Sequence, residues 1–372
     1  MTAPFSDSFS PSLHGLRAIA ALSVVLFHWY QIFPAFSDHL ATPFPDASVL
    51  SPVTYFGFGW LGVPLFFVLS GYLLGGQVIH RSLSVTFLRI FWARRLLRIY
   101  PAVWFHLGVL VLVAPLVTGL IRPEMLDSFV LQLLLWINMP TQMQPPISNV
   151  LWTLPIELSF YVVLPFIGVI SRRVHWILVL SASLTVTLLW RNFLIQSQEV
   201  ENYVVLLPYL DMLPGTLFTF MVGYSLNFLP ELPDRASVKS GLLVSGILFL
   251  ALLQWQLSLN DVYWTGHWIL IIWPPCVALT IAMIVYFVEQ PALSSKWLEY
   301  PVMIWLGNIS FGVYLWHYPI MRSMALLTPE TWSAPEASLA ALPVALLATL
   351  SIATLSYRWI ERPLMNWGRS PS

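Results

Sequence analysis

Cysteine and charge are both scarce in this sequence. Cys276 is the single cysteine among 372 residues, which excludes a disulfide framework and a metal cluster held by several thiolates. Charged residues make up 9% of the chain, whereas an ordinary soluble domain carries about 25%. Basic and acidic residues balance at 17 each, which excludes a strongly basic nucleic-acid-binding protein. We therefore expect no metal site, no permanently bound cofactor and no nucleic-acid partner.

Apolar residues are abundant, at 58% of the chain. Because a transmembrane helix needs about 20 apolar residues, the sequence predicts an all-α polytopic membrane protein with ten spans. The run 128–138 is too short to cross and is predicted to be interfacial or re-entrant. The ten spans are predicted near 16–35, 58–79, 99–120, 149–171, 174–192, 206–229, 240–257, 267–288, 301–322 and 337–359.

The segments between these runs are short and contain no linker. We therefore expect a single membrane domain over residues 1–372, without a separate soluble domain. The N-terminal segment has no basic residues before Arg17, which already belongs to the first apolar run, so a cleavable signal is not expected. The two halves show no convincing internal repeat.

The positions of Lys and Arg predict the orientation. With the N-terminus in the cytoplasm, most basic residues fall on the inner side, while Arg122, Arg191 and Arg322 fall outside. This bias is the positive-inside rule. We expect a multi-pass protein of the plasma (inner) membrane with both termini in the cytoplasm and the lipid bilayer as its surroundings.

Two ionisable residues lie deep inside predicted spans. His28 is eleven residues after Arg17, so on a helix the two side chains lie within ~20° of each other and ~16 Å apart along the axis. Glu157 lies ~12 Å below the outer boundary and His28 ~18 Å above the inner boundary of a ~30 Å core. Ionisable groups at such depth indicate a functional site. We predict that Glu157 pairs with His28, orienting it and stabilising its protonated form.

Each of these residues also has a purely structural interpretation. His28 could be hydrogen-bonded by a neighbouring helix. Glu157 could accept a hydrogen bond from backbone opened by Pro155. Elsewhere, Asp211 is interpreted as an interfacial residue at a kinked helix end, and Glu361 as closing the last helix at the cytoplasmic surface.

Three arginines follow the second span at its cytoplasmic side: Arg94, Arg95 and Arg98. They could anchor the helix by reaching lipid headgroups, or they could form a clamp for phosphates, which suits the planar guanidinium. In the second span, Ser70 precedes a Gly71–Gly75 spacing that favours close helix packing. His317 lies among aromatic residues that are typical of interfacial anchors.

Six motifs, in this order, resemble the acyltransferase-3 family of integral membrane acyltransferases over essentially the whole chain. They are HGLRAIAALSVVLFH (14–28), GWLGVPLFFVLSGYLL (59–74), RRLLRIYP (94–101), WTLPIELSFYVVLP (152–165), ISFGVYLWHYPI (309–320) and IERP (360–363). Two departures from the family pattern are His14, where aspartate is common, and Thr153, where serine is usual.

The resemblance implies transfer of an acyl group, commonly acetyl from acetyl-CoA, to a hydroxyl of a glycan, a lipid-linked sugar or a secondary metabolite. It implies a catalytic role for His28 as general base or transient acyl carrier, assisted by Glu157. Acyl-CoA is the expected co-substrate. The residues expected to bind donor or substrate are Arg17, Arg94, Arg95, Arg98, Ser70, Trp152 and His317.

Two functions of other classes remain open. A secondary transporter also buries charged residues near the membrane midplane. A non-catalytic membrane protein that scaffolds glycan assembly would tolerate the loss of His28. The acceptor carbohydrate, or other hydroxylated acceptor, is not specified by the sequence.

Overall fold

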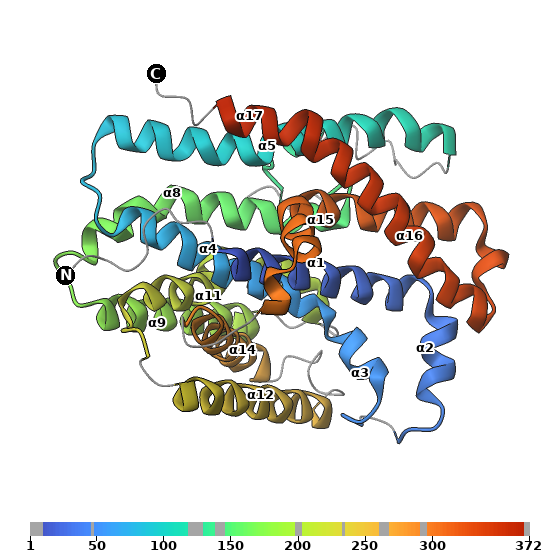
Figure 1. The fold of residues 1–372 in the computed structure, drawn as a ribbon, viewed down its shortest axis with the longest axis horizontal. Helices are drawn as coiled ribbons and strands as arrows, with labels where there is room; N and C mark the ends of the chain where they lie inside the picture. Colours follow the sequence, from blue (N-terminus) through green and yellow to red (C-terminus); the bar gives the residue numbers. More distant parts are fainter. Residues whose placement is uncertain are drawn as a thin grey trace.

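The structure is a computed structural model of residues 1–372, described here for 10–45, 48–117, 129–137, 146–197, 203–232, 235–259, 268–290 and 296–367. Within these ranges every regular element is a helix and there is no strand. The predicted all-α class is therefore confirmed. Figure 1 shows α5 (Val85–Val117) and α12 (Arg235–Ser258) running along the long axis of the molecule.

The other α-helices have the following bounds: α1 Pro11–Ile32, α2 Pro34–Ala41, α3 Pro52–Gly57, α4 Gly62–Val78, α7 Phe129–Leu133, α8 Leu154–Ile170, α9 Trp176–Ser197, α10 Leu207–Leu210, α11 Leu213–Ser225, α14 Ile269–Val288, α15 Pro301–Leu327, α16 Pro335–Ser356 and α17 Arg362–Trp367. Short 3₁₀ segments join several of them, and a π-helical turn, Tyr357–Glu361, connects α16 to α17.

Eight described segments are long and apolar enough to cross a membrane. The remaining two predicted spans, 206–229 and 301–322, correspond to the 13-residue α11 and the 27-residue α15. The five-residue α7 lies in the stretch predicted not to cross, and its length of about 8 Å is far below the membrane thickness. The multi-span architecture is thus confirmed, while the count of ten and the side of each terminus stay predictions.

Small residues let the central helices approach closely. A Cβ added at Gly71 of α4 would lie 1.9 Å from the carbonyl oxygen of Phe220 in α11, and one at Gly223 of α11 would lie 2.0 Å from that of Val68. At this contact a glycine of each helix therefore lies directly against the backbone of the other helix. This confirms the packing interpretation of the small residues in the second span.

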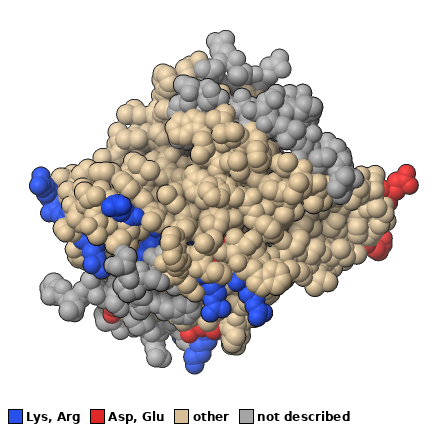
Figure 2. All heavy atoms as spheres, turned by 90° about the horizontal axis from the view of Figure 1, so that it is seen from above, with Lys and Arg blue, Asp and Glu red and all other residues tan. Residues whose placement is uncertain are grey.

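Charge is unevenly distributed along the long axis. In Figure 2 the visible Lys and Arg side chains lie over the left and lower parts of the surface, whereas acidic side chains alone are visible at the right end. The helix α1 begins toward the left end in Figure 1. This polarity agrees with an N-terminus on the positive, cytoplasmic side.

One arginine predicted to lie outside is in fact buried. Arg191 of α9 has a side chain 2% exposed and forms a 2.9 Å ion pair with Asp211. Its guanidinium also donates to the carbonyl oxygens of Leu270, at 2.7 Å, and Leu210, at 3.1 Å. The interpretation of Asp211 as merely interfacial is therefore wrong, because its carboxylate compensates a buried cation that joins α9, α10 and α14.

Candidate active site

A cavity of about 240 Å³ lies among α1, α4, α5, α8 and α15. Three guanidinium groups line it, from Arg17 on α1 and from Arg95 and Arg98 on α5. Glu157 and Tyr161 of α8 form part of the opposite wall. We call this space the cationic cavity. It brings together residues that are far apart in the sequence, which is how a binding site inside a helix bundle is usually built.

Glu157 is held by two hydroxyl groups. The Ser70 hydroxyl donates a hydrogen bond of 2.9 Å to Glu157 Oε1. The Tyr161 hydroxyl donates to the same oxygen from one helical turn further along α8. Ser70 therefore does more than fill space between helices. The partners of this carboxylate are these two side-chain hydroxyls and not a backbone group opened by Pro155, so the alternative interpretation of Glu157 is wrong.

His28 faces a different neighbour. Its Nδ1 lies 2.9 Å from Nε2 of His317 on α15 and 3.1 Å from the carbonyl oxygen of Val24. The predicted pairing of His28 with Glu157 is therefore wrong. Equal depth in the membrane did not bring the two side chains together, because α1 presents His28 to α15 while α8 presents Glu157 to α4.

The hydrogen-bond partners assign the tautomer of both imidazoles. His317 Nδ1 lies 3.0 Å from the Val313 carbonyl oxygen, which can only accept, so Nδ1 carries the proton. In a neutral His317, Nε2 must then accept, and His28 Nδ1 must be the donor. His28 Nε2 consequently bears a lone pair and has no hydrogen-bond partner among the described residues. This atom is the one suited to act as a base or nucleophile.

A tyrosine lies between the cationic cavity and the two imidazoles. Tyr314 lines the cavity, and its ring centroid lies 6.0 Å from that of His317. Its hydroxyl is fixed by Thr153 Oγ1 at 3.0 Å and by the Val150 carbonyl at 2.9 Å. His28 itself does not line the cavity. The site therefore has two parts, which Tyr314 connects.

The three arginines after the second span do not act as one group. Arg95 lines the cavity and donates to Gln77 Oε1, with its guanidinium 5.2 Å from the Phe91 ring centroid. Arg94 is exposed and lies outside the cavity. The predicted grouping of Arg94 with Arg95 and Arg98 is therefore wrong, because Arg95 and Arg98 line the cavity together with Arg17 and Arg94 does not.

His317 and Trp152 also differ from their predicted settings. His317 is fully buried and contacts His28 of α1, so it is not an exposed aromatic-belt residue. Trp152 lines a second, larger cavity instead of the cationic one. The two cavities share Val63 and Phe67 in their walls.

Sequence reasoning missed two residues around the cationic cavity. Tyr161 could have been found from its four-residue spacing to Glu157, which places both on one helix face. Glu361 was expected at the cytoplasmic surface, but it is 3% exposed and accepts a 3.0 Å bond from Ser356. Its charge acts on Arg17 and Arg98. The π-helical turn that carries it is a feature often found at functional sites.

No group of three or more metal-ligating side chains is present in the described part of the chain. The site is instead a cavity lined by three guanidinium groups beside a pair of imidazoles, enclosed in a polytopic helical bundle. These features fit the class of membrane-embedded enzymes. The chain belongs to the acyltransferase-3 family, whose model, described as an acyltransferase domain, matches residues 10–358. The enzyme class predicted from the sequence is thereby confirmed.

Several bacterial proteins are similar to almost the whole chain. The peptidoglycan O-acetyltransferase OatA of Listeria monocytogenes is 27% identical over 99% of this chain and 57% of its own length. The O-acetyltransferase OatA of Staphylococcus aureus is 26% identical over 98% of this chain and 58% of its own length. A putative peptidoglycan O-acetyltransferase, YrhL of Bacillus subtilis, is 24% identical over 97% and 55%. The chain thus spans little more than half of these relatives. No solved structure matches it.

Proposed function

We propose that this protein transfers an acyl group, acetyl in the simplest case, from acyl-CoA to a hydroxyl of a carbohydrate acceptor. The observation that carries the proposal is the surplus of positive charge in the cationic cavity, where three guanidinium groups lie near two carboxylates. Coenzyme A presents several phosphates, and the planar fork of arginine binds phosphate oxygens in pairs. Two of the similar proteins are named a peptidoglycan O-acetyltransferase and a putative peptidoglycan O-acetyltransferase, and these names support a glycan as the acceptor.

The cavity has more positive than negative charge. Three arginines, Arg17, Arg95 and Arg98, face two carboxylates, Glu157 and Glu361, which leaves one surplus cation when all five are ionised. Among the described residues, the guanidinium groups of the cavity form no ion pair with an N–O distance within 4 Å. Arg191 and Asp211, outside this cavity, do form one.

Two nitrogens of these arginines lack any partner. The Nε atoms of Arg17 and Arg95 are buried and make no hydrogen bond within the described residues. A buried cation with unmet hydrogen-bonding capacity is costly, so a site that keeps two of them is built to receive an anion. A phosphate-bearing donor supplies both the charge and the acceptor oxygens.

The imidazole pair supplies the chemistry. His28 Nε2 takes the proton of the acceptor hydroxyl as its oxygen attacks the thioester carbonyl, and the tetrahedral intermediate then collapses to the ester and the CoA thiol. In the alternative route Nε2 attacks first and carries the acyl group to the acceptor. Both routes begin with a neutral His28. Along α1, Arg17 and His28 are ~16 Å apart, a separation that the long pantetheine arm of CoA is suited to bridge.

Two variants separate a phosphate clamp from simple membrane anchoring. Lysine keeps the charge but loses the planar fork. In protein reconstituted in lipid nanodiscs, Arg95→Lys with Arg98→Lys should raise the KM for acetyl-CoA by at least tenfold. Arg94→Lys, at an exposed position of the same helix, is the matched control and should leave this KM unchanged. Equal effects in both proteins, or no effect in either, would contradict the clamp.

A further inference from the structure

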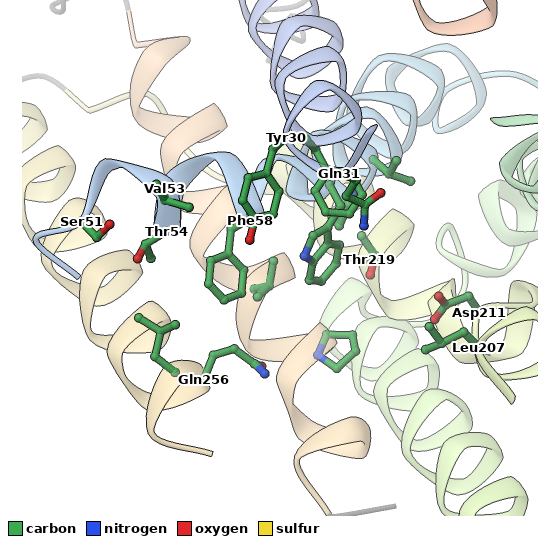
Figure 3. Close-up of a pocket in the computed structure, with 18 of the residues that line it drawn as sticks. Tyr30, Gln31, Ser51, Val53, Thr54, Phe58, Leu207, Asp211, Thr219 and Gln256 are labelled. Atoms are coloured by element: carbon green, nitrogen blue, oxygen red, sulfur yellow. The ribbon is translucent and has the colours of Figure 1, made fainter. Parts of the chain in front are cut away.

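The second cavity is larger and differs in character from the first. It has a volume of about 700 Å³ and lies among α1, α3, α4, α9, α11, α12 and α14. This is within the range of ~300–1,000 Å³ typical of small-molecule sites. Figure 3 shows its walls, with Tyr30 and Gln31 from α1, Thr219 from α11 and Gln256 from α12 facing a common space.

The cavity contains buried polar atoms without partners. Gln256 is 3% exposed, and its Oε1 makes no hydrogen bond in the described part of the chain. The same holds for the hydroxyl of Ser51, which is 6% exposed and lines the opposite side. In Figure 3 the Gln256 amide extends into the space bounded by Phe58 and Thr219. Such groups are costly to leave unpaired, which indicates a ligand that brings hydroxyl or amide groups.

The cavity carries no surplus charge. Its charged lining residues are Arg191 and Asp211, which neutralise each other in the ion pair described above. The Arg191 guanidinium is further occupied by carbonyl oxygens, including that of Gly215 at 3.3 Å. A phosphate would therefore find no available cation here, unlike in the cationic cavity. The cationic cavity therefore suits an anionic ligand, whereas this second cavity suits an uncharged one.

Aromatic side chains form much of the remaining wall, namely Phe27, Tyr30, Phe44, Phe58, Trp60 and Trp152. Flat aromatic faces beside a few amide and hydroxyl groups suit a ligand with an apolar face and a polar edge. A pyranose ring has this form, because its C–H groups gather on its faces and its hydroxyls point outward. The lining therefore matches an uncharged sugar better than a nucleotide.

The position of the cavity fits an acceptor. It shares Val63 and Phe67 with the cationic cavity, so these side chains separate the two spaces. Phe67 is held in place by stacking on Phe220, with centroids 4.5 Å apart. On the other wall, Phe27 precedes His28 and contacts its ring edge-to-face at 5.2 Å. A ligand here would lie next to both the donor space and the imidazole pair.

We propose that this second cavity is the acceptor site and binds an uncharged sugar unit, with the Gln256 amide as its polar anchor. The assignment of the sugar as acceptor rests on the proposed acyltransferase function, but sugar binding itself does not. With the predicted orientation, the segment between α2 and α3, which contributes Ser48 and Ser51 to the lining, lies on the outer side. Donor and acceptor would thus enter from opposite sides of the membrane.

Thiol protection tests the site without requiring turnover. In a Cys276→Ser background, Thr219→Cys places a single thiol in the cavity, and Thr54→Cys places one at a second lining position. The protein is kept in nanodiscs, free of sugar detergents, and labelled with a charged methanethiosulfonate reagent. The uncharged disaccharide N,N′-diacetylchitobiose should slow labelling at least fivefold, whereas acetyl-CoA at the same concentration should not.

The anchor is tested with a matched pair of variants. Gln256→Leu should abolish protection by the disaccharide, whereas Gln254→Leu, at an exposed position of α12, should retain it. Protection by acetyl-CoA but not by the disaccharide would overturn the proposal. Labelling of both thiols that neither compound slows would overturn it as well. Protection that survives Gln256→Leu would overturn the anchor. If the arginine variants leave acetyl-CoA dependence unchanged while sugar protection holds, the proposed function fails and the sugar site stands.

Discussion

Nε2 of His317 lies 2.9 Å from Nδ1 of His28, and this contact, together with the Val24 carbonyl oxygen at 3.1 Å, leaves Nε2 as the nitrogen of His28 that is available for chemistry. The Val313 carbonyl fixes the proton on His317 Nδ1. His317 Nε2 therefore accepts a hydrogen bond, and His28 Nδ1 donates it. His317 does not itself line the cationic cavity. We propose that it is a positioning residue, which with the Val24 carbonyl holds His28 in the tautomer with Nε2 unprotonated.

The first prediction concerns this pair. His28→Ala should reduce kcat by ~10²–10⁴, the usual contribution of a general base, with normal amounts of protein in the membrane. His317→Phe should also lower kcat, because His28 then keeps the Val24 carbonyl as its acceptor but loses the second acceptor that orients its ring. The KM for acetyl-CoA should change little in either variant, since neither ring lines the cationic cavity. The measurement is initial rates at saturating donor.

A graded substitution distinguishes positioning from mere packing. In His317→Gln the side-chain amide oxygen can occupy the place of Nε2 and accept from His28, so it should recover more of the rate than His317→Phe. Because His28 must begin neutral, activity should fall on the acid side of the pH profile, and His317→Phe should move that limb. Identical losses and identical pH profiles in both His317 variants would refute the tautomer argument.

Glu157 gives a second prediction, which follows from its separation from His28. Glu157→Gln keeps an acceptor for Ser70 and Tyr161 but removes a charge that acts on Arg17. The variant should change the KM for acetyl-CoA and leave the acid limb of the kcat profile where it is in the parent. A shift of the acid limb of the kcat profile, with an unchanged KM for acetyl-CoA, would instead indicate that Glu157 and His28 are directly coupled.

The sequence predicted the helices better than the contacts among them. Hydropathy located the spans because each needs a long apolar run, and depth along the helix followed from residue counting. α15 was predicted as a span over 301–322, although it is less apolar than the eight segments that are long and apolar enough to cross a membrane. Its polar residues, Ser310 and His317, are fully buried against α1 rather than exposed to lipid. A helix shielded by its neighbours can be more polar than hydropathy allows.

Rotation about each helix axis was the part that the sequence left undetermined. Counting residues put His28 and Glu157 at one depth, yet it carried no information on which neighbour each side chain faces. The same limit applies to the arginines of α5. The sequence did not predict that Arg95 and Arg98 line the cavity while Arg94 is exposed. Both outcomes depend on how helices distant in the sequence pack together. The spacing of Arg17 and His28 was informative because both lie on one helix.

A third prediction concerns stability and the segment before α1. Glu289 accepts hydrogen bonds of 2.8 Å from the hydroxyls of Ser10 and Ser12, just beyond the end of α14. Burial raises the pKa of the Glu289 carboxyl above its ordinary value of 4.5, against the opposing effect of the two serine hydroxyls. A raised carboxyl pKa means that the folded state binds this proton more tightly than the unfolded state. Its contribution to stability is therefore largest at acid pH and declines as pH rises from about 4.5 through the raised pKa.

Glu289→Gln should remove this pH dependence while keeping an acceptor for the serines. Thermal unfolding of nanodisc samples between pH 4 and pH 8 is the measurement, and the Tm difference between variant and parent should grow in favour of the variant as pH rises. Glu330→Gln, at an exposed position, is the control and should follow the parent. A constant Tm difference across this pH range would contradict the raised pKa.

The last prediction concerns orientation, which the two-sided entry of donor and acceptor requires. In a Cys276→Ser background, Ser82→Cys lies in the exposed turn between α4 and α5, and Ser333→Cys lies between α15 and α16. With the N-terminus inside, a membrane-impermeant thiol reagent applied to intact cells should label Ser333→Cys, and Ser82→Cys should be labelled only after the membrane is opened. Both substitutions replace an uncharged residue, so the distribution of Lys and Arg that sets the topology is unchanged. The reverse pattern would place the cationic cavity toward the outside, where CoA is not available, and would end the proposed direction of transfer.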